Sequence, residues 1–290
     1  MIIAKNQKAV DTALAKIRQQ DEKAKIGLVM TMGALHGGHM TLIAEAKKKC
    51  THVICSIFVN PAQFNNPNDL ATYPRTLESD LNLLEDHNCD LVYAPDVDTV
   101  YPKGEQPYHI DLEGLDEGME GTFRPGHFKG VCMVVERFFE MTKPDYAYFG
   151  KKDYQQLAIV RKLTAIRQLP IEIIGVSIAR AENGLAMSSR NQLLTDAEKE
   201  EARLISYALR QGLDFAIHNR SAEQIQEHIL SHFEETQFEV EYVAIVHNDT
   251  LKPVDHVDDN TTVCIVVYCR TVRLLDNMQF ADTLRPLSSH

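Results

Sequence analysis

Hydrophobic residues in the first 178 positions form short continuous runs separated by stripes of helical spacing. The runs have the length and nearly unbroken apolar character of parallel strands covered on both faces, and they lie at 26–30, 53–59, 91–94, 146–149 and 171–177. The helical stripes lie at about 6–20, 38–49, 76–86, 131–141 and 154–167. Strands that alternate with helices predict an α/β fold with a doubly wound, parallel, Rossmann-like sheet and right-handed crossovers.

The pattern changes after residue 178. Two helical stripes, at about 196–216 and 222–235, precede apolar strands at about 239–246, 263–268 and 271–275. We therefore predict two domains: residues 1–178 form the Rossmann-like domain, and residues 179–290 form a smaller C-terminal α+β domain. The acidic, glycine-rich residues from 112 to 130 show no period, and so long a loop in a compact domain is usually functional or mobile.

The stretch from Ile26 to Lys49 organises the rest of the chain. An apolar run leads into the small and polar segment 31–39, TMGALHGGH, and then into a helix with Leu42, Ile43 and Ala46 on one face. Three glycines within six residues allow the backbone to come close to a ligand. The helix start should direct unpaired N–H groups and a partial positive charge at the turn, so we expect this strand–turn–helix unit to bind phosphate.

Two histidines, His36 and His39, lie three residues apart at the mouth of this helix. Imidazoles there can donate hydrogen bonds to phosphoryl oxygens as negative charge builds up in a transition state. The segment is neither the phosphate loop of NTPases nor the dinucleotide fingerprint. Two other interpretations stay open: a glycine-rich turn with two solvated histidines, and a metal site, although no third ligand lies at useful spacing nearby.

Polar clusters also follow other predicted strands. They are Asn60 with Gln63, the segment 150–156 (GKKDYQQ), and Arg180 with the segment 186–191 (AMSSRN). Because ligands bind at the carboxyl ends of the strands in an open α/β sheet, we expect these clusters to share one edge with the histidine turn. Each cluster also has a structural interpretation, as a turn, a charged helix start or a helix N-cap.

Composition narrows the classes of function. Hydrophobic residues make up 44% of the 290 residues and charged ones 24%, as in a soluble globular enzyme. The formal net charge of −11 argues against a basic face for nucleic acid. No apolar stretch approaches the roughly 18 residues of a membrane span, and the N-terminus has no signal-peptide core, so we expect a cytoplasmic protein without a membrane partner.

The six cysteines include no C-x-x-C pair and lie mostly inside apolar runs. This pattern predicts reduced, packed thiols rather than a disulfide or a zinc site. No serine or cysteine nucleophile has a histidine and acid signature near it. The residues alone therefore predict a nucleotide-dependent transferase or ligase, and they do not name its acceptor.

Six segments, in this order, closely resemble the pantoate–β-alanine ligase (pantothenate synthetase) family, which lies in the nucleotidylyltransferase superfamily with the H-x-G-H motif. They are TMGALHGGH (31–39), SIFVNPAQFN (56–65), YPRTLESD (73–80), FRPGHFKGV (123–131), FGKKDYQQL (149–157) and GLAMSSRN (184–191). The resemblance runs over nearly the whole chain. Six ordered motifs are far more specific than the H-x-G-H motif alone.

The resemblance implies a two-step reaction. (R)-Pantoate and ATP, with Mg²⁺, first form pantoyl adenylate and pyrophosphate, and β-alanine then attacks the acyl adenylate to release pantothenate (vitamin B5, a precursor of coenzyme A) and AMP. It also implies a Rossmann-like domain that binds nucleotide and pantoate, a smaller domain that closes over the ATP site, and a homodimer.

The resemblance assigns roles at the matching positions. Catalytic roles fall to His39, His36, Lys152, Ser188, Ser189 and Arg190. ATP would contact Met32, Gly33, Ala34, Leu35, His36, Gly37, Gly38, His39, Gly150, Lys151, Lys152, Asp153, Ala179, Met187, Ser188, Ser189 and Arg190. Gln63 and Gln156 would bind pantoate, Gln63 would also bind β-alanine, and Asp80 would lie near the metal. Tyr73, Glu120 and His127 would lie around the site.

Two positions depart from the family pattern, with Met30 in place of a proline and Gly37 in place of an acidic residue. We expect them to loosen the backbone and to shift ATP affinity at most, because neither change removes a donor. Two alternative functions are an adenylyltransferase with another small acceptor and a nucleotide sensor without turnover. The sequence argues against the sensor, because a sensor would tolerate the loss of the motifs' polar residues and all of them are present.

Overall fold

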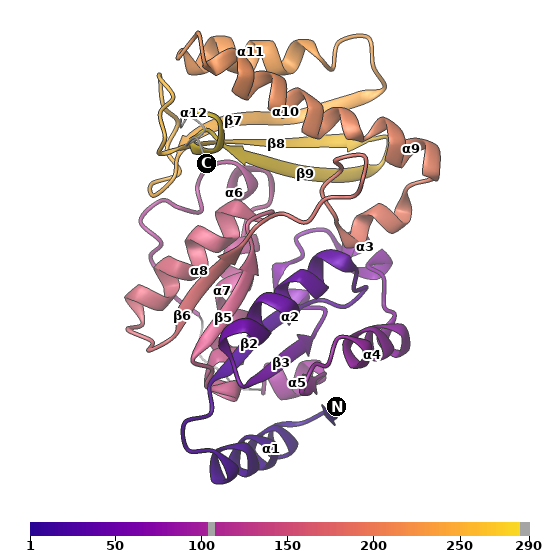
Figure 1. The fold of residues 1–290 in the computed structure, drawn as a ribbon, viewed down its shortest axis with the longest axis vertical. Helices are drawn as coiled ribbons and strands as arrows, with labels where there is room; N and C mark the ends of the chain where they lie inside the picture. The colour runs from indigo at the N-terminus through magenta and orange to yellow at the C-terminus, as the bar shows by residue number, and fades with distance from the viewer. Residues whose placement is uncertain (104–107, 285–290) are drawn as a thin grey trace, which may run out of the picture. The chain divides into compact units, whose positions relative to one another are not determined.

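The computed structural model describes residues 1–103 and 108–284, which divide into two compact units (Figure 1). The first unit comprises Met1–Lys151 and Gln156–Ser177, and the second comprises Lys152–Gln155 and the residues from Ile178 onwards. The short segment Lys152–Gln155 thus groups with the second unit, which no hydrophobic pattern indicated.

Six parallel strands form the sheet of the first unit, in the order β1-β4-β3-β2-β5-β6. They are β1 Ile2–Ala4, β2 Ile26–Thr31, β3 His52–Ile57, β4 Leu91–Tyr93, β5 Tyr146–Gly150 and β6 Glu172–Val176. The predicted parallel α/β sheet is confirmed. The strand order reverses between β2 and β5, and in folds of this kind ligands bind outside the carboxyl ends of the strands at such a switch point.

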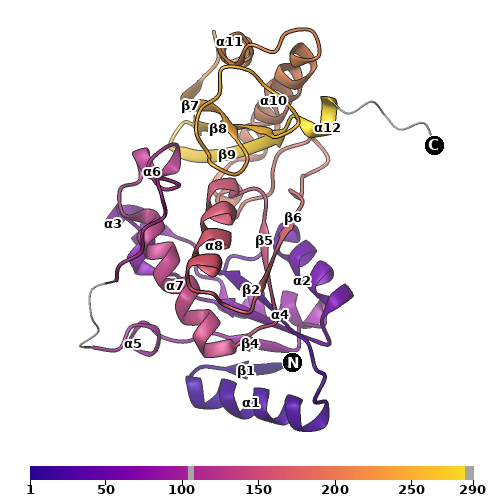
Figure 2. The same ribbon diagram turned by 90° about the vertical axis from the view of Figure 1, so that its left-hand side faces the viewer.

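Helices cover both faces of this sheet, which explains why its central strands are mostly apolar. The helices α2 (Gly37–Lys49) and α4 (Leu77–Asp86) pack on one face, and α1 (Gln7–Gln20), α7 (His127–Thr142) and α8 (Tyr154–Ile166) pack on the other (Figure 2). Short helical elements complete the unit: η1 Pro61–Gln63, α3 Pro67–Thr72, α5 Val97–Val100 and α6 Glu120–Phe123.

The second unit is the predicted α+β arrangement, with an antiparallel sheet in the order β7-β8-β9. Its elements are η2 Ser189–Leu193, α9 Asp196–Glu201, α10 Arg203–Ala216, α11 Ala222–Ser231, β7 Phe238–His247, β8 Thr261–Cys269, β9 Val272–Gln279 and α12 Ala281–Leu284. The helices α10 and α11 cover one face of the sheet, where Leu209, Ile225 and Ile265 are completely buried.

Three details differ from the sequence-based expectation. Strand β1 was missed because it has three residues, and Ile2 and Ile3 stay about half exposed at the sheet edge. The helix expected at 196–216 is interrupted at Ala202, whose N–H reaches both Glu198 O and Glu200 O. The segment expected to lack structure contains α6 and the start of α7. All six cysteines are buried, and none of them forms a disulfide in the part of the chain that the structure describes.

Candidate active site

Asp80 anchors the turn that follows β2. Gly33 and Ala34 have left-handed φ values of 82° and 50°. The Asp80 carboxylate, 2% exposed, accepts from Ala34 N–H at 3.0 Å and from Leu35 N–H at 2.8 Å. Thr76 Oγ1 donates to the same carboxylate at 3.1 Å. A Cβ atom at Gly33 would lie 3.1 Å from Asp80 Oδ2, so both the φ value and the close approach favour glycine there.

His36 and His39 form a reciprocal capping box at the start of α2. His36 is the N-cap, and its Nδ1 accepts from Gly38 N–H at 3.1 Å, while Nδ1 of His39 accepts from His36 N–H at 3.3 Å. The two ring centroids are 4.1 Å apart. A ring nitrogen that accepts from an amide carries no hydrogen, so each neutral imidazole has its proton on Nε2.

This arrangement narrows one sequence-based expectation. The helix start was expected to offer unpaired backbone N–H groups, but the amide of Gly38 bonds to His36, and the amides just before the helix, those of Ala34, Leu35 and His36, bond to Asp80 and His39. These four amides are therefore occupied within the turn, and the imidazole Nε2–H groups are candidate donors to an anion. The usual N-caps are Ser, Thr, Asp and Asn, so a histidine capping box is an unusual choice that also fixes the tautomer of each ring.

The side chain of Gln63 has a defined orientation. Asn60 Oδ1 accepts from Tyr101 Oη at 2.7 Å and from Ala62 N–H at 3.2 Å, which identifies Nδ2 as the Asn60 donor. That Nδ2 donates to Gln63 Oε1 at 2.9 Å. Gln63 Nε2 is then the end of the amide that points away from Asn60, and it lies 3.3 Å from Met32 Sδ, beside the histidine turn.

The backbone of Gln63 is held from the other side by His127. The carbonyl of Gln63 can only accept, so His127 Nδ1, 2.8 Å away, donates to it. His127 Nε2 lies 3.3 Å from Arg124 Nη1, and Arg124 also pairs with Glu120 at 3.5 Å. Because arginine only donates, His127 is neutral with its proton on Nδ1. Glu120 and His127, predicted around the site, thus support Gln63 through its main chain.

Helix α7 approaches the η1 segment too closely for any side chain at Gly130. A Cβ atom there would lie 2.2 Å from Ala62 O and 2.6 Å from Gln63 N. Asn60 Nδ2 also donates to Gly130 O at 3.0 Å. The structural interpretation of Asn60-Pro61 as a turn is confirmed, since Asn60 is the N-cap of η1, and the same asparagine orients Gln63.

The second unit contains the other predicted cluster. The side chain of Lys152 is 17% exposed, and its Nζ lies 3.8 Å from Asp153 Oδ1. Ser188 is the N-cap of η2, as its structural interpretation predicted, and Ser189 is 7% exposed. Before it, Met187 N–H donates to Ala179 O at 2.9 Å, which closes the loop that leads to η2.

Other predicted residues lie on the first unit. Gly150 ends β5, and the N–H of Lys151 donates to Val176 O at 2.8 Å. Gln156 lies half-buried in the first turn of α8. Tyr73 is buried with its ring edge-on to Phe64, at 5.7 Å between centroids. The glycines Gly37 and Gly38 belong to α2, so neither supplies the left-handed conformation that Gly33 does.

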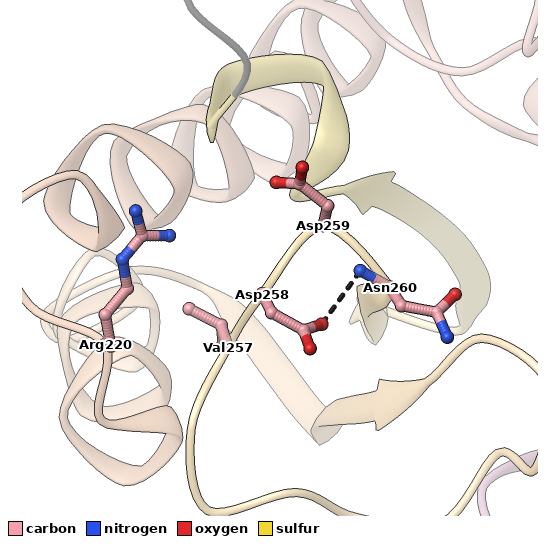
Figure 3. Close-up of a pocket in the computed structure, with 5 residues that line it drawn as sticks. All are labelled: Arg220, Val257, Asp258, Asp259 and Asn260. Atoms are coloured by element: carbon pink, nitrogen blue, oxygen red, sulfur yellow. Dashed lines mark hydrogen bonds between the residues drawn. The ribbon is translucent and has the colours of Figure 1, made fainter.

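Figure 3 shows a cavity of about 380 Å³ in the second unit, lined by Arg220, Val257, Asp258, Asp259 and Asn260. Asp258 Oδ1 accepts from Asn260 N–H at 2.8 Å, and Arg220 O accepts from Val257 N–H at 2.9 Å. These bonds shape the loop itself. None of the predicted site residues lines this cavity.

Comparison with known proteins gives the same answer as the six motifs. The profile of the family described as Pantoate-beta-alanine ligase matches residues 2–279. The chain belongs to this family. A pantothenate synthetase of Bacteroides thetaiotaomicron is 42% identical over 278 residues, which cover 95% of this chain and 97% of the relative.

Solved structures of the ligase family have the same fold. The pantothenate synthetase of Thermus thermophilus superposes with a TM-score of 0.88 at 35% identity, covering 97% of this chain and 99% of that one. The ligase of Francisella tularensis, complexed with beta-gamma ATP and beta-alanine, superposes with a TM-score of 0.79 at 36% identity, covering 97% and 98%. The family and the enzyme class expected from the sequence are confirmed.

Sequence reasoning missed several residues that position the site in this member of the ligase family. Tyr101 acts on Asn60 and has no sequence signal, because the contact joins residues far apart in the chain. Arg124 acts on His127 and lies inside the motif FRPGHFKGV, but the motif alone gave it no role. Asp276 and Asn277 carried a signal: they are adjacent polar residues inside the otherwise mostly apolar strand β9, and both are buried.

The described residues do not form a protein cage for a divalent cation. In residues 1–103 and 108–284, no three His, Cys, Asp or Glu side chains gather as metal ligands. Both carboxylate oxygens of Asp80 accept hydrogen bonds from the turn. Asp80 therefore has a structural partner set, and its predicted place near a metal rests on the resemblance alone. Within the same residues, no helix has both the length and the apolar character needed to cross a membrane.

Proposed function

We propose that this protein condenses (R)-pantoate with β-alanine to form pantothenate, through a pantoyl adenylate, with release of pyrophosphate and AMP. The observation that carries the proposal is the histidine capping box, which commits His36 and His39 to the Nε2–H tautomer at the N-terminus of α2. ATP as the activating substrate is supported by the Francisella relative, whose structure is a complex with beta-gamma ATP and beta-alanine.

In the first step, a carboxylate oxygen of pantoate attacks the α-phosphorus of ATP. A new P–O bond forms, the bond to pyrophosphate breaks, and negative charge grows on the phosphoryl oxygens. The Nε2–H groups of His36 and His39 can donate to those oxygens while their Nδ1 atoms stay on the capping bonds, so no reorganisation of the turn is needed. The positive end of the α2 dipole acts in the same direction.

Gln63 is proposed to hold pantoate and then β-alanine. Because Asn60 occupies its Oε1, Gln63 presents the donor Nε2, which suits a hydroxyl or carboxylate oxygen of the substrate. Gln156 is proposed as the second amide for pantoate. In the second step the amine of β-alanine attacks the acyl carbon, the amide C–N bond forms, the bond to AMP breaks, and the amine loses a proton.

The proposal keeps the nucleotide contacts assigned by resemblance: the turn residues Met32 to His39, then Gly150, Lys151, Lys152, Asp153, Ala179, Met187, Ser188, Ser189 and Arg190. Mg²⁺ is proposed to arrive with the triphosphate as MgATP, because magnesium commonly uses substrate phosphates and waters for most of its coordination. A homodimer, a cytoplasmic location and closure of the smaller domain over ATP also belong to the proposal.

The first experiment measures AMP and pantothenate formation by the purified protein with MgATP and pantoate, with and without β-alanine. We expect the two products in equal amounts, and only when all substrates are present. AMP formed with another acid or amine instead would move the function to a different adenylating enzyme. ATP binding without AMP formation would favour the sensor.

Substitution of the histidines can separate capping from catalysis. Gln at N3 preserves a capping box, so His39→Gln should keep the stability of α2 but lower kcat by about 10²-fold, the usual effect of losing one transition-state donor. His39→Ala should lose both the bond and the activity. If His39→Gln had the same kcat as the unmodified protein, His39 would have no part in the chemical step.

A further inference from the structure

Two adjacent buried residues of β9 bond to Lys152 and to Arg180, in the two parts of the second unit that carry the proposed nucleotide contacts. Asp276 is 3% exposed and Asn277 is 4% exposed, although β9 is an edge strand of its sheet. Polar side chains this deeply buried need partners. The partners identify what the strand holds in place.

Asn277 holds the segment that carries Lys152. Its Nδ2 donates to the main-chain carbonyl of Lys152 at 2.8 Å, across 125 positions of sequence. The Lys152 side chain leaves from the same residue, so this bond fixes the point from which the ammonium group extends. A carbonyl only accepts, so an acidic residue in place of Asn277 would set oxygen against oxygen.

Asp276 holds the segment that leads to Ser188. Its two carboxylate oxygens accept from Arg180 Nη1 at 2.6 Å and Nη2 at 2.9 Å, a bidentate pair. Arg180 Nη1 also donates to Gly184 O at 3.1 Å. The main chains of Arg180 and Ala186 form an isolated antiparallel β-bridge. Arg180 was expected in a polar cluster at the ligand edge of the sheet, and the structure shows its guanidinium bonded to this carboxylate.

The register of β9 directs the two side chains to opposite faces of the sheet. Asp276 pairs with Ile265, whose side chain belongs to the core under α10 and α11, and Asn277 pairs with Cys264, one step along. Successive residues of a strand point to opposite faces. One strand therefore contacts the Lys152 segment from one face and the Arg180 segment from the other. The two residues are also joined directly, because the N–H of Asn277 donates to Asp276 Oδ1 at 2.7 Å.

We propose that Asp276 and Asn277 are a positioning pair that sets Lys152 and the 187–190 segment for ATP, each through its own partner. This inference rests on the proposed nucleotide contacts of those two segments. Neither residue is assigned contact with ATP. Their effect on ATP should pass through Lys152 for Asn277 and through Arg180 for Asp276.

The test measures the Kd for ATP by calorimetry without pantoate, so it needs no turnover. Asn277→Asp should weaken ATP binding about tenfold, the worth of one hydrogen bond converted at about 1.4 kcal/mol per decade. Asn248→Ala is the matched control: Asn248 Oδ1 accepts from Thr262 Oγ1 at 2.6 Å in the same unit. It should change the Kd by less than about twofold. If Asn277→Asp does not fold, Asn277→Ala takes its place.

A double-mutant cycle separates positioning from general destabilisation. In a Lys152→Ala background, Asn277→Asp should weaken ATP binding less than about twofold further. Arg180→Lys loses the bidentate pair with Asp276, and it should weaken ATP binding by the same factor with and without Lys152→Ala. Equal effects of Asn277→Asp and the Asn248 control would overturn the proposal, as would full additivity with Lys152→Ala. A protein that binds ATP but makes no pantothenate would refute the proposed function while the cycle still tests the pair.

Discussion

Replacement of Asp80 by asparagine tests whether this carboxylate is an anchor of the histidine turn or a metal ligand. The asparagine side chain would have the same shape, but only one oxygen would remain for the two backbone N–H groups of Ala34 and Leu35. The other position would carry an NH₂ group facing an N–H donor. The turn would have to move, and with it the helix start that bears His36 and His39.

The expected loss follows from the hydrogen bonds of the carboxylate. Hydrogen bonds to a charged group contribute about 1.5–3 kcal/mol each, and Asp80→Asn removes one and weakens the other. We expect the free energy of unfolding to fall by about 2–4 kcal/mol, or Tm to fall by roughly 4–16 °C for a unit of this size. The KM for ATP should rise because the displaced turn would no longer hold the two imidazoles in a single orientation.

The assay is thermal and urea unfolding in EDTA and again with excess Mg²⁺. An anchor predicts the same loss in both buffers, because the partners of Asp80 are backbone groups. Asp86→Asn, on the same helix but exposed, is the matched control and should stay within about 0.5 kcal/mol of the unmodified protein. Unchanged unfolding of Asp80→Asn in EDTA, together with a shifted Mg²⁺ requirement for activity, would refute the anchor and favour the metal ligand.

Three further predictions concern other parts of the chain. Gly130→Ala should lower the free energy of unfolding by about 1–3 kcal/mol and reduce turnover, because its Cβ would overlap the η1 backbone. Gly118→Ala, where a Cβ would have nothing within 4 Å, should change neither quantity. Equal unfolding midpoints for the two variants would contradict this prediction. Tyr101→Phe should raise the KM for pantoate about 3–10-fold with the KM for ATP unchanged, measured by initial rates, and the opposite pattern would refute its role in orienting Gln63. Burial, and then the charge of His228, lowers the pKa of His232 below its ordinary 6.5. The unfolded chain therefore binds this proton more readily than the folded one, and the free energy of unfolding should fall as the pH drops below about 6.5. Urea titrations at several pH values should show a flatter dependence for His232→Gln.

The fold could be predicted from the sequence wherever burial was two-sided. The runs that became β2 to β5 are mostly apolar because helices cover both faces, and an apolar run of strand length between helical stripes is rarely anything but a buried strand. Strand β1 could not be found this way, since Ile2 and Ile3 lie at an edge and its three residues set no period. Lys152–Gln155 could not be assigned to the second unit, because contacts with residues far along the chain, such as the bond from Asn277 to the Lys152 carbonyl, have no sequence pattern.

The sequence proposed residues for the candidate site but not the bonds among them. The strand–turn–helix pattern indicated where His36 and His39 lie, and their spacing matches the N-cap and N3 positions of a capping box. Serine or threonine and glutamate are the residues expected at those two positions, so the histidines suggested ligand binding alone. The structure shows that they cap the helix as well, which is why the amides of His36 and Gly38 already have acceptors.

The positioning bonds of this protein mostly end on main-chain groups: Asp80 on two amides, His127 on the Gln63 carbonyl, and Asn277 on the Lys152 carbonyl. An amide N–H only donates and a carbonyl only accepts, and neither changes with pH in the physiological range. Such partners leave one acceptable hydrogen-bonding pattern for each side chain. The isosteric exchanges Asp80→Asn and Asn277→Asp should therefore be as harmful as truncation to alanine, although a comparison of residue types ranks them as mild. If alanine proved clearly worse at both positions, packing rather than donor and acceptor matching would determine the geometry of this site.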